Sequence, residues 1–491
     1  MARVDESSIA NDRGYRDSLT KVEPYGVEHI PEVERHGKAS SQFFIWFAAG
    51  LNFPIIVLGF SATYFGLSMP QAIMAIVAGA LVGSSTMGLL SRMGVKLGIP
   101  QQMQARGPLG FVGNMFPVAY VNVFAGIGWA AVTVILGGKA LSELTPLPFW
   151  VSALILMLIQ LGVALMGYNL IHYLQKILAY VLLAGFVLIT VVSLSKSGVQ
   201  LEANPHAAGF LGAGGWITFF GYFLSYLIAW LPFASDYSRY LPDTGTTRRN
   251  TGIFTMLGNF VTVAWMGVLG VVLASSASTD DPITALHQLM GPWAVPGLLV
   301  ITISALSQNF LNVYGGAISV QTMGIPVKRT TAVVFICVAS YILSLAGETA
   351  IYQSFNVFLN LTAYCITPMA AVLICDYYLG GRQTKRGLAQ IFDKSRKFEW
   401  GFVAWLAGVV GSSPFWVSSL YTGPIAAAFP KLGDLTFYVS AAIACIVYFL
   451  TYRLRPLSNR NLPALALDPH ANDSTAAMSA TGTADVAQEA V

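Results

Sequence analysis

Continuous apolar runs, each about 20 residues long and so able to cross a bilayer as α-helices, fill most of the chain between residues 43 and 455. Transmembrane strands would alternate apolar and polar residues over about ten positions, and these runs do not alternate. The pattern predicts an all-α polytopic membrane protein with twelve transmembrane helices. The runs begin near Phe43, Gln71, Gly107, Trp150, His172, Trp216, Gly252, Trp293, Thr331, Tyr352, Trp400 and Leu435.

Two of the predicted spans are interrupted at corresponding places. The first span is broken over residues 48–54, which include Gly50 and Pro54, and the sixth is broken over residues 229–232, which end in Pro232. A matched pair of broken helices five spans apart is typical of transporters built from inverted repeats, whose binding site lies where the breaks meet. We therefore expect a leucine-transporter-type arrangement of five spans, five inverted spans and two extra helices.

The same pattern predicts how the chain is organised. The first segment is polar, carries both signs of charge and lacks the apolar core and cleavage site of a signal peptide. The last segment is rich in Ala, Ser, Thr, Asp and Glu, a composition typical of disorder. The predicted parts are a cytosolic N-terminal tail (1–42), a ten-helix transporter core (43–380), a cytosolic loop (381–399), two additional transmembrane helices (400–455) and a disordered cytosolic C-terminal tail (456–491).

Charge sets the predicted orientation. If the N-terminus is inside, all but three of the 27 Lys and Arg residues lie in cytosolic segments, and only Lys139, Lys196 and Lys431 lie outside. Because basic residues accumulate in cytosolic loops, both termini are predicted to be cytosolic in a multi-pass protein of the cell membrane. An even number of spans follows.

The amino-acid composition excludes several classes of protein. The chain is 55% hydrophobic and 10% charged, which excludes a soluble domain. It has no Walker-type glycine loop and no zinc-type His/Glu spacing, so we expect no enzyme, no ATP-driven step, no metal and no cofactor. The four cysteines fall inside predicted spans and are expected to be small buried apolar residues. The net charge of +4 is spread over short loops and does not indicate a nucleic-acid partner.

Polar residues deep in the spans are candidates for solute binding. Few are charged, which favours a neutral polar solute, since intramembrane charges are costly and usually functional. Ser304, Gln308 and Asn312 recur every four residues and share one face of span 8. This face either lines a cavity that binds a solute or joins helices through hydrogen bonds.

Two tryptophans lie away from the span ends. Trp150, Trp216, Trp293 and Trp400 sit at span ends, as interfacial tryptophans do. Trp129 and Trp230 instead lie at the depth of the breaks. Two indoles at this depth either sandwich a flat ring or pack the protein core.

Charged residues near the cytosolic end of the spans have more ordinary predicted roles. Asp236 and Arg239 are three residues apart after the span 6 break, which predicts a structural or gating ion pair. His172 and Lys176 at the start of span 5 are candidates for snorkelling to the interface.

Several segments between residues 22 and 455 resemble, in their order and spacing, nucleobase:cation symporters of the first type, most closely the purine-cytosine permeases of bacteria and fungi. The resemblance implies the leucine-transporter type of fold and an import function. The segments are 22–28, 34–37, 44–49, 98–103 with Arg106 and Gly110, 128–129, 167–168, 230–242, 312–314, 367–368 and 376–379.

The resemblance also implies a substrate site. By the family's pattern, Trp129 and Trp230 are stacking residues and Asn312 hydrogen-bonds the substrate. Thr133 occupies a position where several relatives carry an amide side chain. With Gln308 from the polar face of span 8, these residues form the predicted substrate site.

The coupling ion is less well specified by the resemblance. In sodium-driven relatives the cation site uses span 1 carbonyls and span 8 hydroxyls, which here correspond to Ala48, Leu51, Leu306 and Ser307. Leu306 carries no side-chain oxygen, so a sodium site would be incomplete. Gln175 stands where fungal proton-coupled members carry a glutamate, so a membrane carboxylate for a proton relay is missing as well. Either a proton or a sodium ion is expected, with the proton favoured.

These observations predict a secondary active symporter. Its substrate would be a neutral nucleobase of the cytosine or purine type, or a related planar heterocycle, imported by alternating access. The alternatives are a carrier of hydantoin, allantoin or a thiamine-type vitamin, a passive channel, and a transporter-like receptor. Expected partners are the small-molecule substrate, the coupling cation and the lipid bilayer, with the oligomeric state left open.

Overall fold

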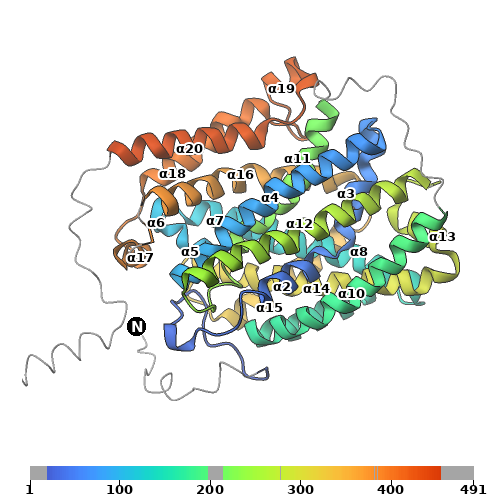
Figure 1. Cartoon of the computed structure of the whole chain (residues 1–491), viewed down its shortest axis with the longest axis horizontal. Helices are drawn as coiled ribbons and strands as arrows, with labels where there is room; N and C mark the ends of the chain where they lie inside the picture. Colours follow the sequence, from blue (N-terminus) through green and yellow to red (C-terminus); the bar gives the residue numbers. More distant parts are fainter. Residues whose placement is uncertain (1–18, 197–213, 277, 381, 384, 455–491) are drawn as a thin grey trace, which may run out of the picture.

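The computed structural model describes residues 19–196, 214–276, 278–380, 382–383 and 385–454. These residues form an all-helical bundle without strands (Figure 1). The long helices are α4 (Met69–Leu97), α8 (Trp129–Leu144), α9 (Phe149–Met166), α10 (Tyr168–Lys196), α11 (Gly214–Trp230), α12 (Gly245–Ser276), α14 (Ala294–Thr322), α15 (Arg329–Gly347), α16 (Ile351–Leu379), α18 (Trp400–Ser412) and α20 (Thr436–Leu454).

Shorter helices complete the bundle. They include the two halves of span 1, the helical turns before α8, and the connectors between spans. They are α2 (Ser41–Gly50), α3 (Phe53–Phe60), α5 (Gln101–Gln104), α6 (Arg106–Leu109), α7 (Met115–Val121), α13 (Pro282–Met290), α17 (Lys385–Phe392) and α19 (Pro424–Ala428).

Most of the predicted spans form helices that are long enough to cross a membrane. In the described part of the chain, nine helices are long and apolar enough to cross a membrane, and the bent pair α2 and α3 makes up to ten. The last two predicted spans form shorter apolar helices, Trp400–Phe415 and Thr436–Tyr452. The polytopic all-α class is confirmed, while the number twelve stays a prediction.

The start of span 3 differs from the prediction. The apolar run begins near Gly107, but the continuous helix begins at Met115. Gly110 has a φ of +84°, a left-handed value that an α-helix does not contain. The chain between α6 and α7 therefore turns, and hydropathy alone does not detect such a turn.

Helix pairing follows the predicted repeat. Spans 1 and 2 (α2, α3 and α4) pack mainly on spans 6 and 7 (α11 and α12), and spans 3 and 4 (α8 and α9) pack on spans 8 and 9 (α14 and α15). Spans 1 to 4 of the first repeat thus pack on spans 6 to 9 of the second repeat. Helices α18, α20 and α16 pack together along one edge of the bundle (Figure 1).

Close backbone contact holds α3 against α12. A Cβ added at Gly59 would lie 2.0 Å from the carbonyl oxygen of Gly267, and one added at Gly270 would lie 2.1 Å from the carbonyl oxygen of Ile56. Small residues allow membrane helices to approach in this way. The short second half of span 1 is therefore fixed on span 7.

Both predicted helix breaks are present. In span 1, α2 and α3 are bent by 52°, and Asn52 between them is extended and accepts a hydrogen bond from the N–H of Ile55 (3.3 Å). In span 6, α11 ends at Trp230 and Pro232 lies in the 3₁₀ turn that follows. Further turns continue to Tyr240, so span 6 does not resume an α-helix.

The described part of the N-terminal segment packs against one end of the bundle. The carboxylate of Glu23 is fully buried and lies 3.0 Å from the guanidinium of Arg239. It also accepts hydrogen bonds from the hydroxyls of Tyr240 (2.5 Å) and Tyr314 (2.8 Å) and from the N–H of Tyr168 (3.1 Å). One carboxylate from the predicted tail thus joins the ends of spans 5, 6 and 8.

The predicted Asp236–Arg239 ion pair is wrong. Arg239 pairs with Glu23 instead, and Asp236 accepts a hydrogen bond from the N–H of Gln101 (3.0 Å). The spacing rule for ion pairs assumes an α-helix, whereas residues 234–240 form turns. His172 does not snorkel either, because its ring lies 3.9 Å from the Tyr168 ring, centroid to centroid.

The tryptophans and cysteines largely follow the prediction. Trp150, Trp293 and Trp400 are exposed, while Trp216 is half-buried and donates its indole N–H to the carbonyl of Gln71 (3.0 Å). All four cysteines are free thiols, of which Cys337 and Cys365 are buried and Cys375 and Cys445 are half-buried.

Replacing Glu23 with Ala should destabilise the fold strongly. The change leaves the buried Arg239 charge without its partner, which typically costs about 3–5 kcal/mol. The midpoint of thermal unfolding of the purified protein should fall clearly. Glu32→Ala is the matched control, because Glu32 lies in the same segment but is exposed. Equal midpoints for the two variants would contradict the structural role of Glu23.

Candidate functional site

The two helix breaks and span 3 meet at Tyr226 of α11. The Tyr226 hydroxyl accepts a hydrogen bond from the side-chain amide of Asn52 in the span 1 break (2.7 Å). The Tyr226 ring meets the Trp129 ring edge-on, with centroids 5.4 Å apart. Tyr226 therefore connects spans 1, 3 and 6 at the depth of the breaks.

The two predicted stacking tryptophans are both buried but do not contact each other. Trp129 packs edge-on against Phe355 (5.8 Å) and Phe358 (5.5 Å) of α16, between ring centroids. Trp230 packs against Trp46 of α2 (5.6 Å). The two indoles thus belong to one aromatic cluster with Tyr226, but their rings do not face each other as a sandwich around a flat ring would require.

A π-helical turn lies directly before Trp129. Residues Asn122–Gly128 adopt this conformation, which often marks functional sites inside helices. The Asn122 side chain donates to the carbonyl of Gly316 in α14 (2.8 Å), and a Cβ added at Gly126 would lie 3.1 Å from the Cα of Gly316. Spans 3 and 8 are therefore held in close contact next to Trp129.

The polar face of span 8 points between span 3 and the span 6 break. The Asn309 side chain donates to the carbonyl of Ala130 in α8 (2.9 Å), and a Cβ added at Gly315 would lie 2.6 Å from the ring of Phe233 in the span 6 break. Each residue of an α-helix turns the side-chain direction by about 100°. Gln308 and Asn312 consequently lie between these two directions, facing the junction around Trp129 and Trp230.

Gln308 has unused hydrogen-bonding capacity. It is fully buried, and neither its side-chain oxygen nor its nitrogen has a partner among the described residues. The indole N–H of Trp129 is also buried without a partner. Buried polar groups are almost always hydrogen-bonded, so an unpaired amide here indicates a group that a ligand would satisfy.

The other predicted polar residues bond within the protein. The Asn312 amide donates to the side chain of Asn309 (2.8 Å). The Thr133 hydroxyl donates to the carbonyl of Trp129 (2.8 Å), and that of Ser304 to the carbonyl of Ile301 (2.7 Å). Of the predicted face of span 8, Gln308 is thus the member with both polar atoms free.

The predicted cation residues show a different arrangement. The Ser307 hydroxyl donates to the side-chain oxygen of Gln175 in α10 (2.7 Å), and the Gln175 amide donates to the carbonyl of Ser307 (2.6 Å). Ala48 and Leu51 are buried at the span 1 break. Ser307 therefore bonds to Gln175 through both its hydroxyl and its carbonyl, and each of these oxygens keeps a lone pair.

Sequence reasoning missed Tyr226 and Asn52. Tyr226 lies in an aromatic-rich helix, where nothing in the pattern separates it from its neighbours. Asn52 did carry a signal, because it is the one polar side chain within residues 48–54. A polar residue in a membrane break is expected to satisfy the freed backbone groups.

Paired helical repeats, two broken membrane spans and an unpaired buried amide where they meet define a solute transporter. The chain belongs to the family of permeases for cytosine/purines, uracil, thiamine and allantoin, whose sequence model matches residues 29–440.

Individual relatives cover nearly the whole chain. A putative purine-cytosine permease of Bacillus subtilis, YxlA, is 28% identical over 448 residues, covering 89% of this chain and 97% of the relative. The purine-cytosine permease fcyB of Emericella nidulans is 25% identical over 469 residues, covering 89% and 88%.

A solved transporter shares the fold. Mhp1, a nucleobase-cation-symport-1 family transporter in a closed conformation with bromovinylhydantoin bound, superposes with a TM-score of 0.74 at 20% identity, covering 91% of this chain and 98% of Mhp1. The predicted fold class and the predicted family are both confirmed.

Replacing Tyr226 with Phe should destabilise the junction without changing its shape. The variant keeps the ring contact with Trp129 but removes the acceptor of the Asn52 amide, a loss of about 1–3 kcal/mol for a buried donor. The midpoint of thermal unfolding should fall. Tyr222→Phe is the matched control, since Tyr222 is a buried tyrosine one turn earlier in α11. An equal effect of both changes would argue against a special role of Tyr226.

Proposed function

We propose that this protein is a secondary active symporter that imports a neutral, planar heterocycle of the nucleobase type. The observation that carries the proposal is the unpaired Gln308 amide beside an aromatic cluster at the meeting point of two broken spans. Aromatic side chains offer flat faces to a ring, and an amide reads the ring's polar edge. Membership of the permease family supports the same class of solute.

The free amide of Gln308 specifies the kind of edge that it would bind. A primary amide presents an acceptor oxygen next to a donor N–H. Its complement is a ring edge with a donor next to an acceptor, such as the N–H and carbonyl of a lactam or the amino group and ring nitrogen of cytosine. None of the side chains at the junction, Trp129, Tyr226, Trp230, Gln308 and Asn312, is charged, which agrees with a neutral solute.

Hydantoins also carry a lactam edge, so Gln308 alone does not separate them from nucleobases. The relatives named as purine-cytosine permeases support the nucleobase as the first candidate. A binding screen should therefore contain purines, pyrimidines and hydantoins together, with allantoin and thiamine included.

We further propose that both termini lie in the cytosol and that protons drive the import. The distribution of Lys and Arg supports this orientation. Proton coupling is supported by Leu306, which has no side-chain oxygen to offer a sodium ion.

Asp236 is our candidate for the group that exchanges the proton. It lies in the turns that follow the span 6 break, is fully buried, and has one carboxylate oxygen without a partner among the described residues. Its other oxygen accepts a hydrogen bond from the N–H of Gln101 (3.0 Å). The unpaired oxygen of a buried carboxyl is a place where a proton can be taken up and released.

Replacing Gln308 with Ala should weaken substrate binding. Loss of the amide leaves the ring's polar edge unpaired, which costs about 1–3 kcal/mol. The dissociation constant of the nucleobase should therefore rise about tenfold or more, as measured by competition for uptake or by thermal shift. Ser304→Ala is the control, because its hydroxyl bonds within its own helix. Unchanged affinity in the Gln308 variant would refute its assigned role.

Uptake into proteoliposomes should follow the pH gradient and persist when sodium is removed. Asp236→Asn should abolish uphill accumulation, because the amide cannot exchange a proton, yet should retain exchange of labelled for unlabelled substrate across the membrane. Retained exchange distinguishes lost coupling from lost folding. Accumulation that requires sodium and ignores the pH gradient would show that the coupling proposal is wrong.

A further inference from the structure

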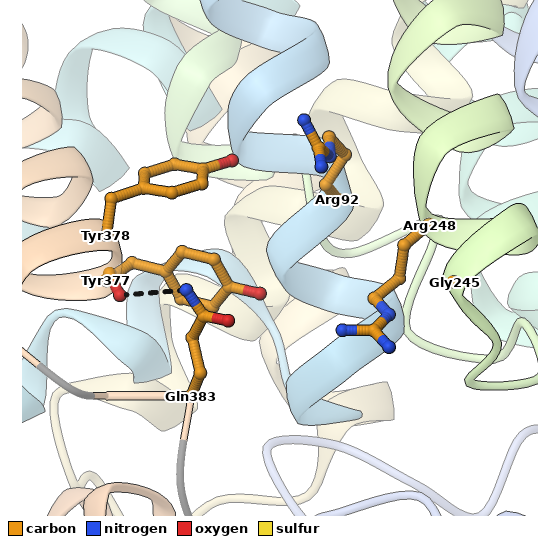
Figure 2. Close-up of a pocket in the computed structure, with 6 residues that line it drawn as sticks. All are labelled: Arg92, Gly245, Arg248, Tyr377, Tyr378 and Gln383. Carbon is orange, nitrogen blue, oxygen red and sulfur yellow. Dashed lines mark hydrogen bonds between the residues drawn. The ribbon is translucent and has the colours of Figure 1, made fainter.

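A cavity of about 210 Å³ lies between the ends of three helices. Arg92 comes from the end of α4, Arg248 from the start of α12, and Tyr377 and Tyr378 from the end of α16 (Figure 2). Gly245 and Gln383 complete the lining. All of these positions lie at the end of the bundle where basic residues gather, which the proposed orientation places at the cytosolic membrane surface.

The cavity is positively charged. Arg92 and Arg248 are the charged residues of its lining, and no carboxylate belongs to it. Asp243 nearby pairs with Arg248 (3.0 Å) and with Lys96 (3.2 Å), so one carboxylate is shared by two cations. No described carboxylate forms an ion pair with Arg92. The local charge is therefore positive, and Arg92 is available to an anion.

The polar groups of the cavity suit an oxygen-rich anion. Figure 2 shows the rings of Tyr377 and Tyr378 extending from α16 towards the helix that bears Arg92, with Arg248 reaching back from α12. A guanidinium offers a planar set of N–H donors that matches the geometry of phosphate. A phosphate group is thus the natural ligand for this set of donors.

Exposed apolar side chains lie on the same helix ends as the lining residues. Tyr378 is 38% exposed and donates its hydroxyl to the carbonyl of Leu89 (3.2 Å). Leu379, Leu89 and Ile253 on the surrounding helices are 52%, 38% and 37% exposed. On a membrane-spanning surface such side chains face lipid tails. The cavity therefore joins a phosphate-binding group of side chains to a surface that accommodates acyl chains.

The geometry points to a binding site for the phosphate headgroup of an anionic phospholipid of the cytosolic leaflet. Arg92 and Arg248 bind the phosphate, and the acyl chains lie over the exposed side chains of Leu89, Ile253 and Leu379. Basic cavities between transmembrane helices on this side of a membrane are suited to such headgroups. Helix α16 makes few direct contacts with α4 in this structure, whereas α4 and α12 pack extensively. The bound lipid joins α16 to that pair.

Thermal unfolding of the full chain in detergent tests this site. Added dioleoyl-phosphatidylglycerol should raise the unfolding midpoint, whereas the same amount of dioleoyl-phosphatidylcholine should not. In Arg92→Gln the apparent affinity for phosphatidylglycerol should be about tenfold weaker, the loss expected for one charge-assisted pair. The matched control is Arg249→Gln, which removes the same charge from an exposed neighbour outside the lining and should respond as the unaltered protein does.

Three outcomes would overturn the proposal. The first is a phosphatidylglycerol response that is unchanged in Arg92→Gln. The second is an equal loss in Arg249→Gln, which would indicate general surface charge. The third is full stabilisation by inorganic phosphate alone with nothing added by the lipid, which would indicate a soluble phosphate ligand. Because the assay contains no transported solute, its result is independent of the proposed substrate and of the coupling ion.

Discussion

A backbone that leaves the α-helix inside a membrane must find protein partners for its N–H and C=O groups, because lipid offers none. This constraint shapes the centre of the protein. In the span 1 break, the Asn52 side chain accepts from the N–H of Ile55 and donates to the carbonyl of Ala49 (2.5 Å). Its remaining bond goes to Tyr226. The residue that satisfies one break therefore also attaches it to the helix that leads into the other.

The polar groups of the span 6 break find their partners within the same segment and in neighbouring segments. After Trp230 the backbone continues in tight turns, in which the N–H of Ala234 donates to the carbonyl of Leu231 (3.3 Å). The end of this segment carries Arg239, whose charge is satisfied by Glu23 from the N-terminal segment. An ion pair this deeply buried is sensitive to loss of either partner. The irregular half of span 6 is thus fixed at one end by the aromatic cluster and at the other by Glu23.

Most of the polar residues that the sequence singled out are hydrogen-bonded within the protein, so a residue that is not is informative. Asn309, Asn312, Thr133 and Ser307 all have partners within the protein, so polar character in a span does not by itself identify a binding residue. Gln308 differs because its amide is buried with neither end bonded. Among the polar residues of the predicted face of span 8, Gln308 is the one whose amide oxygen and nitrogen both lack a partner in the described part of the chain, which makes it our first candidate for a solute-binding residue.

The sequence by itself determined the membrane-spanning helices, the two breaks, the repeat and the family, because these depend on local hydrophobicity and on Gly, Pro and Trp at particular positions. Only the tertiary structure decided which polar groups meet. Glu23 and Arg239 are 216 positions apart in the sequence, and Asn52 and Tyr226 are 174 positions apart, so no local pattern predicts these contacts. The same limit explains the incorrect Asp236–Arg239 pair, since sequence spacing predicts contacts only where the backbone is helical.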